Sequence, residues 1–122
     1  MKAIIAVVEG DKHTVGKDLA KDDMKKNSIE VFDLGVNVPV DVIIQAMKVY
    51  KTNNIVLTAG MTKSNKMVAA TIDKIRMEDR NSFIVFGGQF VTGELAASVG
   101  ADAFAETIED VSKLIIENFK SA

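Results

Sequence analysis

The chain has 122 residues, the length of one ordinary domain, and 48% of them are hydrophobic, which is enough for a self-sufficient apolar core. Its 15 basic and 17 acidic side chains give a net charge of -2, which argues against nucleic acid and anionic membranes as partners. The absence of cysteine excludes disulfides, zinc ribbons, iron–sulfur clusters and thiol catalysis.

Short apolar runs alternate with longer segments of helical period along the whole chain. The first run, residues 3–8, is too short to cross a bilayer or to serve as an export signal, so we expect a cytoplasmic protein. In chain order, we predict strand 2–9, helix 15–26, strand 29–34, helix 41–52, strand 54–58, helix 65–77, strand 82–87, helix 93–99, strand 101–105 and helix 107–119.

This strict alternation predicts an α/β fold, because each strand–helix unit adds one strand to a parallel sheet. In a chain this short it favours a flavodoxin-like (Rossmann-like) three-layer sandwich, with a five-stranded parallel sheet in the order 2-1-3-4-5. No linker, low-complexity tract or internal repeat interrupts the pattern, so we expect residues 1–122 to form a single domain.

Three loops with unusual residues follow the first, third and fourth predicted strands. In an open α/β sheet, ligands bind beyond the carboxyl ends of the strands, at the point where the strand order reverses. The three loops are therefore expected to meet there. They are E-G-D-K-H-T-V-G at 9–16 with the single histidine, T-A-G-M-T-K-S at 58–64, and G-G-Q-F-V-T at 87–92 with the only glycine pair.

Several ligands common to this architecture do not fit these loops. The glycine patterns of dinucleotide-binding folds and of nucleotide hydrolases are both absent. A response regulator would have an aspartate at the end of the third strand, where Thr58 stands. A flavodoxin would have a first loop rich in serine and threonine, whereas this loop has a carboxylate two residues before an imidazole.

Asp11 and His13 form an arrangement typical of a metal-bound imidazole, in which a carboxylate holds one ring nitrogen and the other nitrogen faces the metal. One histidine without cysteine does not make a zinc or iron site by itself. A metal held by a macrocycle needs only one axial ligand, which favours haem or a corrinoid. The chain has only six phenylalanines and one tyrosine, with none in the first loop, and this composition disfavours haem.

Purely structural interpretations of the same residues remain open at this point. A lone histidine in a loop is more often solvent-exposed than a metal ligand. Asp11 suits the N-cap of the helix that follows it, and Thr62 or Ser64 suits the cap of the third helix. The glycine pair at 87–88 is also compatible with a simple turn at the end of a strand.

The three loops together resemble the signature of cobalamin-binding domains, D-x-H-x-x-G, S-x-L and G-G. The matching residues are D-K-H-T-V-G at 11–16, T-A-G at 58–60 and G-G at 87–88, separated by 41 and 26 residues as in the family. The likeness continues through G-V-N-V-P at 35–39 to G-A-D-A-F-A at 100–105, so it covers essentially the whole chain.

The resemblance implies a cobalamin or related corrinoid cofactor whose own base is displaced from cobalt. His13 would then be the lower axial ligand to the metal, Asp11 would orient and polarise it, and Ser64 would continue the hydrogen-bond relay. The full cofactor-binding set that the resemblance implies is Asp11, Lys12, His13, Thr14, Gly16, Thr58, Gly60, Thr62, Ser64, Gly87 and Gly88.

The remaining roles concern the nucleotide tail of the cofactor, which lies beside the sheet in such domains. By resemblance, Gly16 lets the first helix approach the tail, Thr58 places a hydroxyl near the displaced base, and Gly87 and Gly88 admit the nucleotide. Gly60 stands where the family has leucine. This difference implies a roomier tail pocket and leaves a precursor corrinoid or another lower base as alternatives.

The hydroxyls at Thr62 and Ser64, together with D-L-G-V-N-V-P at 33–39, resemble the methyl-transfer branch of the family. The resemblance thus implies a protein that carries a methyl group on cobalt between methyltransferase subunits and is not a complete enzyme alone. The alternatives are a small subunit of an adenosylcobalamin-dependent mutase and a non-catalytic carrier or sensor module. The usual N-terminal helical cap is not expected within these residues, so a partner chain or a homo-oligomer would cover the corrin.

Overall fold

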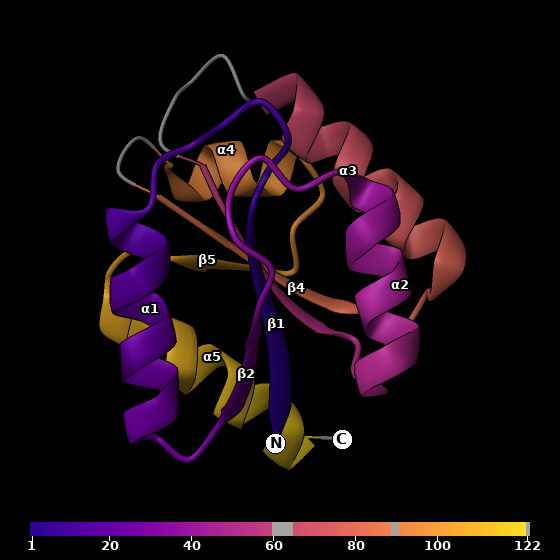
Figure 1. The fold of residues 1–122 in the computed structure, drawn as a ribbon. Helices are drawn as coiled ribbons and strands as arrows, with labels where there is room; N and C mark the ends of the chain where they lie inside the picture. Colours follow the sequence, from indigo (N-terminus) through magenta and orange to yellow (C-terminus); the bar gives the residue numbers. More distant parts are fainter. Residues whose placement is uncertain (60–64, 89–90, 122) are drawn as a thin grey trace.

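The computed structural model of the protein describes residues 1–59, 65–88 and 91–121. Within these ranges, five parallel strands form one sheet in the order β2-β1-β3-β4-β5, and helices alternate with them along the chain (Figure 1). In chain order the elements are β1 (Lys2–Val7), α1 (Val15–Lys26), β2 (Glu30–Asp33), α2 (Val40–Tyr50), β3 (Asn54–Thr58), α3 (Asn65–Glu78), β4 (Phe83–Gly87), α4 (Gly93–Ser98), β5 (Ala103–Ala105) and α5 (Ile108–Ser121). The predicted fold class and strand order are confirmed.

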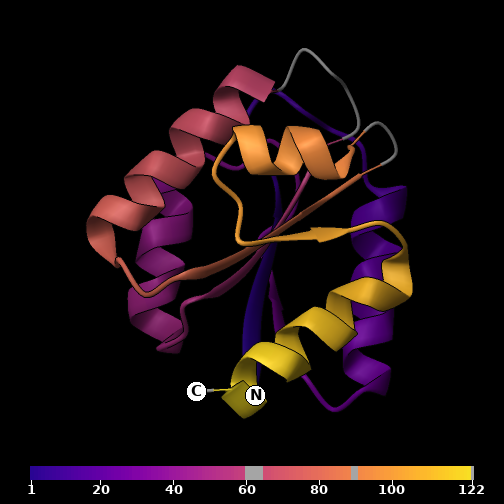
Figure 2. The same ribbon diagram turned by 180° about the vertical axis from the view of Figure 1, so that it is seen from behind.

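The sheet separates two apolar cores, because successive side chains of a strand point to opposite faces. In β1, Ala3 and Ile5 pack toward α1 and α5, whereas Ile4 and Ala6 pack toward α2, α3 and α4. Figure 2 shows α1 and α5 together on one side of the sheet and α2 and α3 on the other. This arrangement is the predicted three-layer sandwich.

The bounds of α1 and β3 are those predicted, and the other element boundaries differ from the predicted ones by at most two residues. The first strand was expected to reach Glu9 but ends at Val7, because Val8 forms only an isolated bridge with Val38 before the chain turns. The second helix ends at Tyr50 because Lys51 adopts a left-handed φ of 55°. Over the described residues, no helix combines the length and the apolarity that crossing a membrane requires.

The register of the sheet aligns the ends of four strands in one row. Val7 of β1 pairs with Thr58 of β3, Thr58 with Gly87 of β4, and Gly87 with Ala105 of β5. All of these strands run in the same direction, so the loops that follow them begin at one edge of the sheet. The row confirms that the first, third and fourth loops start side by side at the carboxyl edge.

Candidate functional site

The loop between β1 and α1 turns sharply to bring Asp11 back toward the sheet. The amide of Val8 donates to the carbonyl of Thr58 at 3.2 Å, which ties the start of the loop to β3. The amide of Asp11 then donates to the carbonyl of Val8 at 3.0 Å, and Gly10 accommodates this turn with a φ of 90°. The Asp11 side chain is consequently buried, with only 1% of the residue exposed.

Asp11 holds His13 through two hydrogen bonds to the same carboxylate oxygen. Its Oδ1 accepts from the His13 backbone amide at 3.0 Å and lies 2.6 Å from Nδ1 of the imidazole ring. A carboxylate accepts and does not donate, so in the neutral imidazole the ring hydrogen would lie on Nδ1 and Nε2 would keep its lone pair. The His13 side chain is 57% exposed, so its ring is not enclosed by the core.

A structural role of Asp11 as helix cap was the alternative to this pairing. The N-cap of α1 is Thr14, and the Thr14 side chain makes no capping hydrogen bond. The alternative in which Asp11 caps α1 is therefore wrong. Lys12 and Thr14, on either side of His13, are both exposed.

A cavity of about 750 Å³ lies at the carboxyl edge of the sheet, on the face covered by α1 and α5. Its walls are mostly small or apolar, and they include Gly16, Leu19, Thr58, Gly87, Phe104 and Val111. Thr58 Oγ1 is buried and has no hydrogen-bond partner among the described residues. Buried polar groups in proteins are nearly always paired, so a polar atom of a ligand in this cavity would satisfy the hydroxyl.

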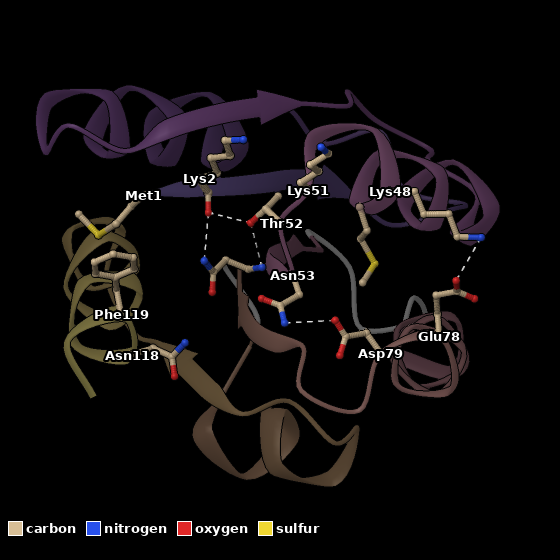
Figure 3. A pocket seen from close by; sticks show the side chains of 12 residues that line it. Met1, Lys2, Lys48, Lys51, Thr52, Asn53, Glu78, Asp79, Asn118 and Phe119 are labelled. Carbon is tan, nitrogen blue, oxygen red and sulfur yellow. Dashed lines mark hydrogen bonds and ion pairs between the residues drawn. The ribbon is translucent and has the colours of Figure 1, made fainter. Parts of the chain in front are cut away.

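A second cavity, of about 700 Å³, lies at the opposite, amino edge of the sheet (Figure 3). Several of its polar groups are already paired with one another. Thr52 and Asn54 both donate to the Lys2 carbonyl, Asn53 donates to Asp79, and Lys48 forms an ion pair with Glu78 in the same pocket. The cavity beside Thr58, which lies at the same edge as His13, is therefore the candidate cofactor site.

Comparison with known proteins points to the same cofactor class. The family model described as "B12 binding domain" matches residues 1–115. The chain belongs to the B12-binding domain family. The predicted family and its corrinoid cofactor are confirmed at this level.

Individual relatives of this B12-binding domain are longer proteins. The chain is 27% identical to monomethylamine corrinoid protein 2 of Methanosarcina barkeri, over 97% of this chain and 56% of that protein. It is 31% identical to trimethylamine corrinoid protein 1 of Methanosarcina acetivorans, over 88% and 51%. A crystal structure of a cobalamin-binding protein from Desulfitobacterium hafniense superposes with a TM-score of 0.89 at 31% identity, over 95% and 58%. The chain thus spans a little over half the length of the proteins it matches.

The structure brings together part of the site set that the sequence predicts. Gly16, Thr58, Gly87 and Gly88 line the cavity, and Asp11 pairs with His13 in the adjoining loop. The predicted positions Gly60, Thr62 and Ser64 lie outside the described residues.

The glycine pair of the B12-binding domain also has a packing role. A Cβ added to Gly88 would overlap the carbonyl oxygen of Ala59, and one added to Gly87 would lie 3.3 Å from the Ala105 side chain. The absent side chains therefore let the ends of β3, β4 and β5 approach one another. A role of the pair in admitting the nucleotide stays a prediction.

Sequence reasoning missed a group of polar residues that support the histidine loop. Lys17 of α1 is 5% exposed, and its Nζ lies 2.7 Å from both Asp18 Oδ1 and Asp33 Oδ2. Asp33 Oδ1 also accepts from the Gly35 amide at 2.8 Å. Asn37 of the same loop bonds Gly10 and Asp11. Asp33, Gly35 and Asn37 all lie in the D-L-G-V-N-V-P segment at 33–39, whose polar residues and glycine could have indicated such a role.

The charges in this group shift each other's pKa. Burial by itself raises the pKa of the Asp33 carboxyl, but hydrogen bonds from Lys17, the Gly35 amide and Lys21 more than offset it, so the pKa lies below its ordinary 3.8. For Lys17 the effect of burial has the opposite sign, and it lowers the pKa. Hydrogen bonds to Asp18 and Asp33 outweigh it, so the pKa of Lys17 lies above 10.5. Both residues are charged at neutral pH and hold α1 against the end of β2.

Replacing Asp33 by asparagine is expected to lower the free energy of unfolding by about 1–3 kcal/mol at pH 7, because the buried Lys17 loses one of its two carboxylate partners. A carboxyl with a lowered folded-state pKa stabilises the protein above 3.8, and this contribution is lost as the pH falls through the lower folded value. The difference between Asp33→Asn and wild type should therefore be constant above pH 3.8 and shrink below it. Urea unfolding at several pH values, with the exposed Asp22→Asn as control, measures this.

Gly16→Ala is expected to affect stability and cofactor binding in opposite directions. Gly16 lies in α1, and a Cβ there would meet no atom within 4 Å, so alanine should raise the stability of the cofactor-free protein by up to about 1 kcal/mol. The added methyl would enter the cavity that Gly16 lines, and cobalamin affinity should fall by roughly tenfold. Thermal unfolding and a cobalamin titration of the same variant test both effects, and unchanged affinity would contradict the assignment of Gly16.

Proposed function

We propose that this chain is the corrinoid-carrying part of a methyltransferase system, with His13 as the lower axial ligand of the bound corrinoid. The observation that carries the proposal is the buried Asp11 carboxylate, which holds Nδ1 of the exposed His13 at 2.6 Å and leaves Nε2 available. A bound corrinoid supplies a cobalt centre that accepts a methyl group and gives it up again.

The residues at the carboxyl edge fit such a group. The chain has one histidine, and within the described ranges no three His, Cys, Asp or Glu side chains gather into a metal site. A single imidazole suits a metal whose remaining ligands come from a macrocycle. The unpaired hydroxyl of Thr58, at the cavity wall, provides a polar contact for a cofactor tail in a pocket that is otherwise largely apolar.

Asp11 would act on the histidine and not on the cofactor itself. Its carboxylate would fix the orientation of the imidazole ring, as carboxylates do for metal-bound histidines generally. The Asp11–His13 pair would thus present one nitrogen of the protein to a bound corrinoid.

The methyl-transfer assignment is supported by the relatives and by the segment between β2 and α2. Curated relatives are named corrinoid proteins for monomethylamine and trimethylamine. The D-L-G-V-N-V-P segment at 33–39 resembles that branch more than the mutase subunits. The partners of this chain would accordingly be methyltransferase subunits, one that methylates the cofactor and one that removes the methyl group.

The test is a titration of the purified protein with hydroxocobalamin, followed by absorbance and, after reduction to Co(II), by electron paramagnetic resonance. We expect a base-off absorbance spectrum and a cobalt signal split by one nitrogen of the protein. A spectrum identical to that of the free cofactor would contradict corrinoid binding. Binding in which the cofactor's own base stays on cobalt would contradict axial ligation by His13.

Methyl carriage is tested separately from cofactor binding. The loaded and reduced protein is incubated with each methyltransferase encoded near it and an isotope-labelled methyl donor. We expect label on the protein-bound cofactor with one of these enzymes. Binding of cobalamin without labelling by any of them would contradict methyl transfer and favour the non-catalytic carrier or sensor module.

A further inference from the structure

Asn37, in the loop between β2 and α2, contacts the histidine loop with both its backbone and its side chain. Its Oδ1 accepts a hydrogen bond from the Gly10 amide at 2.8 Å, and its own amide donates to the Asp11 carbonyl at 2.8 Å. The two bonds span 27 and 26 positions of the chain and grip consecutive residues. Asn37 thereby holds the backbone of Gly10 and Asp11, and the side chain of Asp11 is the carboxylate that binds His13.

The segment that carries Asn37 is itself anchored to the sheet. The Val7 amide donates to the Gly35 carbonyl at 3.0 Å, and the Val38 amide donates to the Val7 carbonyl at 3.0 Å. The Gly35 amide is bound by Asp33, whose carboxylate also pairs with Lys17. Asn37 is thus flanked on both sides by bonds to β1, which anchor its segment to the sheet.

The backbone conformation explains the residue type at this position. Asn37 has a left-handed φ of 52°, which asparagine, aspartate and glycine adopt far more readily than other residues. Glycine would adopt this conformation but has no side-chain acceptor for the Gly10 amide. Aspartate would provide both features. The position therefore needs a left-handed residue that carries a side-chain oxygen.

We propose that Asn37 is a positioning residue of the corrinoid site. It holds Gly10 and Asp11 in place, so that the Asp11 carboxylate keeps the His13 ring in a single orientation. The inference rests on the proposed function of His13 as a cobalt ligand. Asn37 acts through Asp11 and does not contact the cofactor in this proposal. Its loss would lower the fraction of bound cobalt that carries the His13 nitrogen.

Two substitutions separate the side-chain acceptor from the backbone conformation. Asn37→Gly keeps the left-handed φ and removes the acceptor, whereas Asn37→Asp keeps both. Lys51→Gly is the matched control, because Lys51 has a φ of 55° at the opposite edge of the sheet and lies outside the cofactor site. This control measures how a glycine at a left-handed position, away from the histidine loop, affects hydrogen exchange and the cobalt signal.

Two measurements are made on each variant. In the cofactor-free protein, hydrogen exchange of the Gly10 amide is expected to be about three to ten times faster in Asn37→Gly, the factor that one lost hydrogen bond typically gives. In the Co(II)-cobalamin protein, the ratio of nitrogen-split to unsplit signal should fall by a similar factor. Asn37→Asp should restore both quantities, and Lys51→Gly should change neither.

The outcomes distinguish this inference from the proposed function. Nitrogen ligation in wild type with an unchanged ratio in Asn37→Gly would overturn the role of Asn37 alone. A fall in the ratio that Asn37→Asp does not restore would overturn the role of the side-chain oxygen. Absence of nitrogen ligation in wild type would overturn the proposed function, and the inference with it, even if Gly10 exchange responded as expected.

Discussion

His13→Ala is expected to bind cobalamin without a protein nitrogen on cobalt, so that the nitrogen splitting of the Co(II) signal disappears. The variant should fold normally, because the His13 side chain is 57% exposed and its removal leaves no cavity in the core. Added imidazole, which replaces the missing side chain in solution, should restore the splitting. Lys26→Ala, an exposed change at the far end of α1, is the control and should leave the spectrum unchanged.

Asp11→Asn is expected to weaken the ligation of cobalt by His13 and not to abolish it. Both bonds from His13 go to one carboxylate oxygen, so the amide oxygen of asparagine can still accept from the backbone and from Nδ1, but the negative charge beside the ring is lost. Loss of such a partner weakens metal ligation by roughly 10- to 100-fold, and the ratio of ligated to unligated cobalt should fall by that factor.

Full nitrogen splitting in His13→Ala would show that another nitrogen ligates cobalt. An unaffected Asp11→Asn would contradict the role of the carboxylate.

Gly88→Ala is expected to destabilise the cofactor-free protein by about 1–3 kcal/mol or more. The new Cβ would overlap the Ala59 carbonyl oxygen and would lie 3.2 Å from Cγ2 of Val91, so the end of β4 must move away from β3. Gly88 also has a φ of 154°, at the edge of the range that side chains avoid. Urea unfolding of the variant measures the cost.

Gly100→Ala is the control for this prediction. Gly100 has a φ of 90°, but a Cβ there would meet only Ile72 at an ordinary 3.6 Å. Its substitution therefore carries the conformational cost of a left-handed alanine, about 1–2 kcal/mol, without a backbone overlap. If Gly88→Ala cost no more than Gly100→Ala, the close approach to Ala59 would not be a constraint on the fold.

The different origins of the Gly88 and His13 effects bear on how the site works. The His13 side chain is largely exposed, so its replacement should cost little stability, and under the proposed function only its ring nitrogen matters. Gly88 directly follows the row where β3, β4 and β5 end together, and its substitution would disturb the edge from which the loops leave the sheet. A loss of cobalamin binding in Gly88→Ala would therefore reflect a displaced carboxyl edge of the sheet. The same loss in Asp11→Asn would reflect the weakened contact between Asp11 and His13 alone.

Local patterns in the sequence were sufficient for the architecture and for the centre of the site. The strand and helix periods predicted the order of the elements, and parallel strands place the loops that follow them at one edge whatever their length. The pairing of Asp11 with His13 was predictable because two residues separated by one position in a glycine-containing loop reach each other without help from the rest of the chain.

The tertiary structure decided the interactions between residues far apart in the sequence. The bond from Gly10 to Asn37 and the ion pair of Lys17 with Asp33 depend on how β1 and β2 pair, and single-residue patterns carry no information about that register. The family resemblance marked Gly88 as a place where a ligand approaches, and the fold adds that the Ala59 carbonyl lies close to it. Local spacing thus determined that Asp11 and His13 pair, and strand pairing determined which residues hold their loop in place.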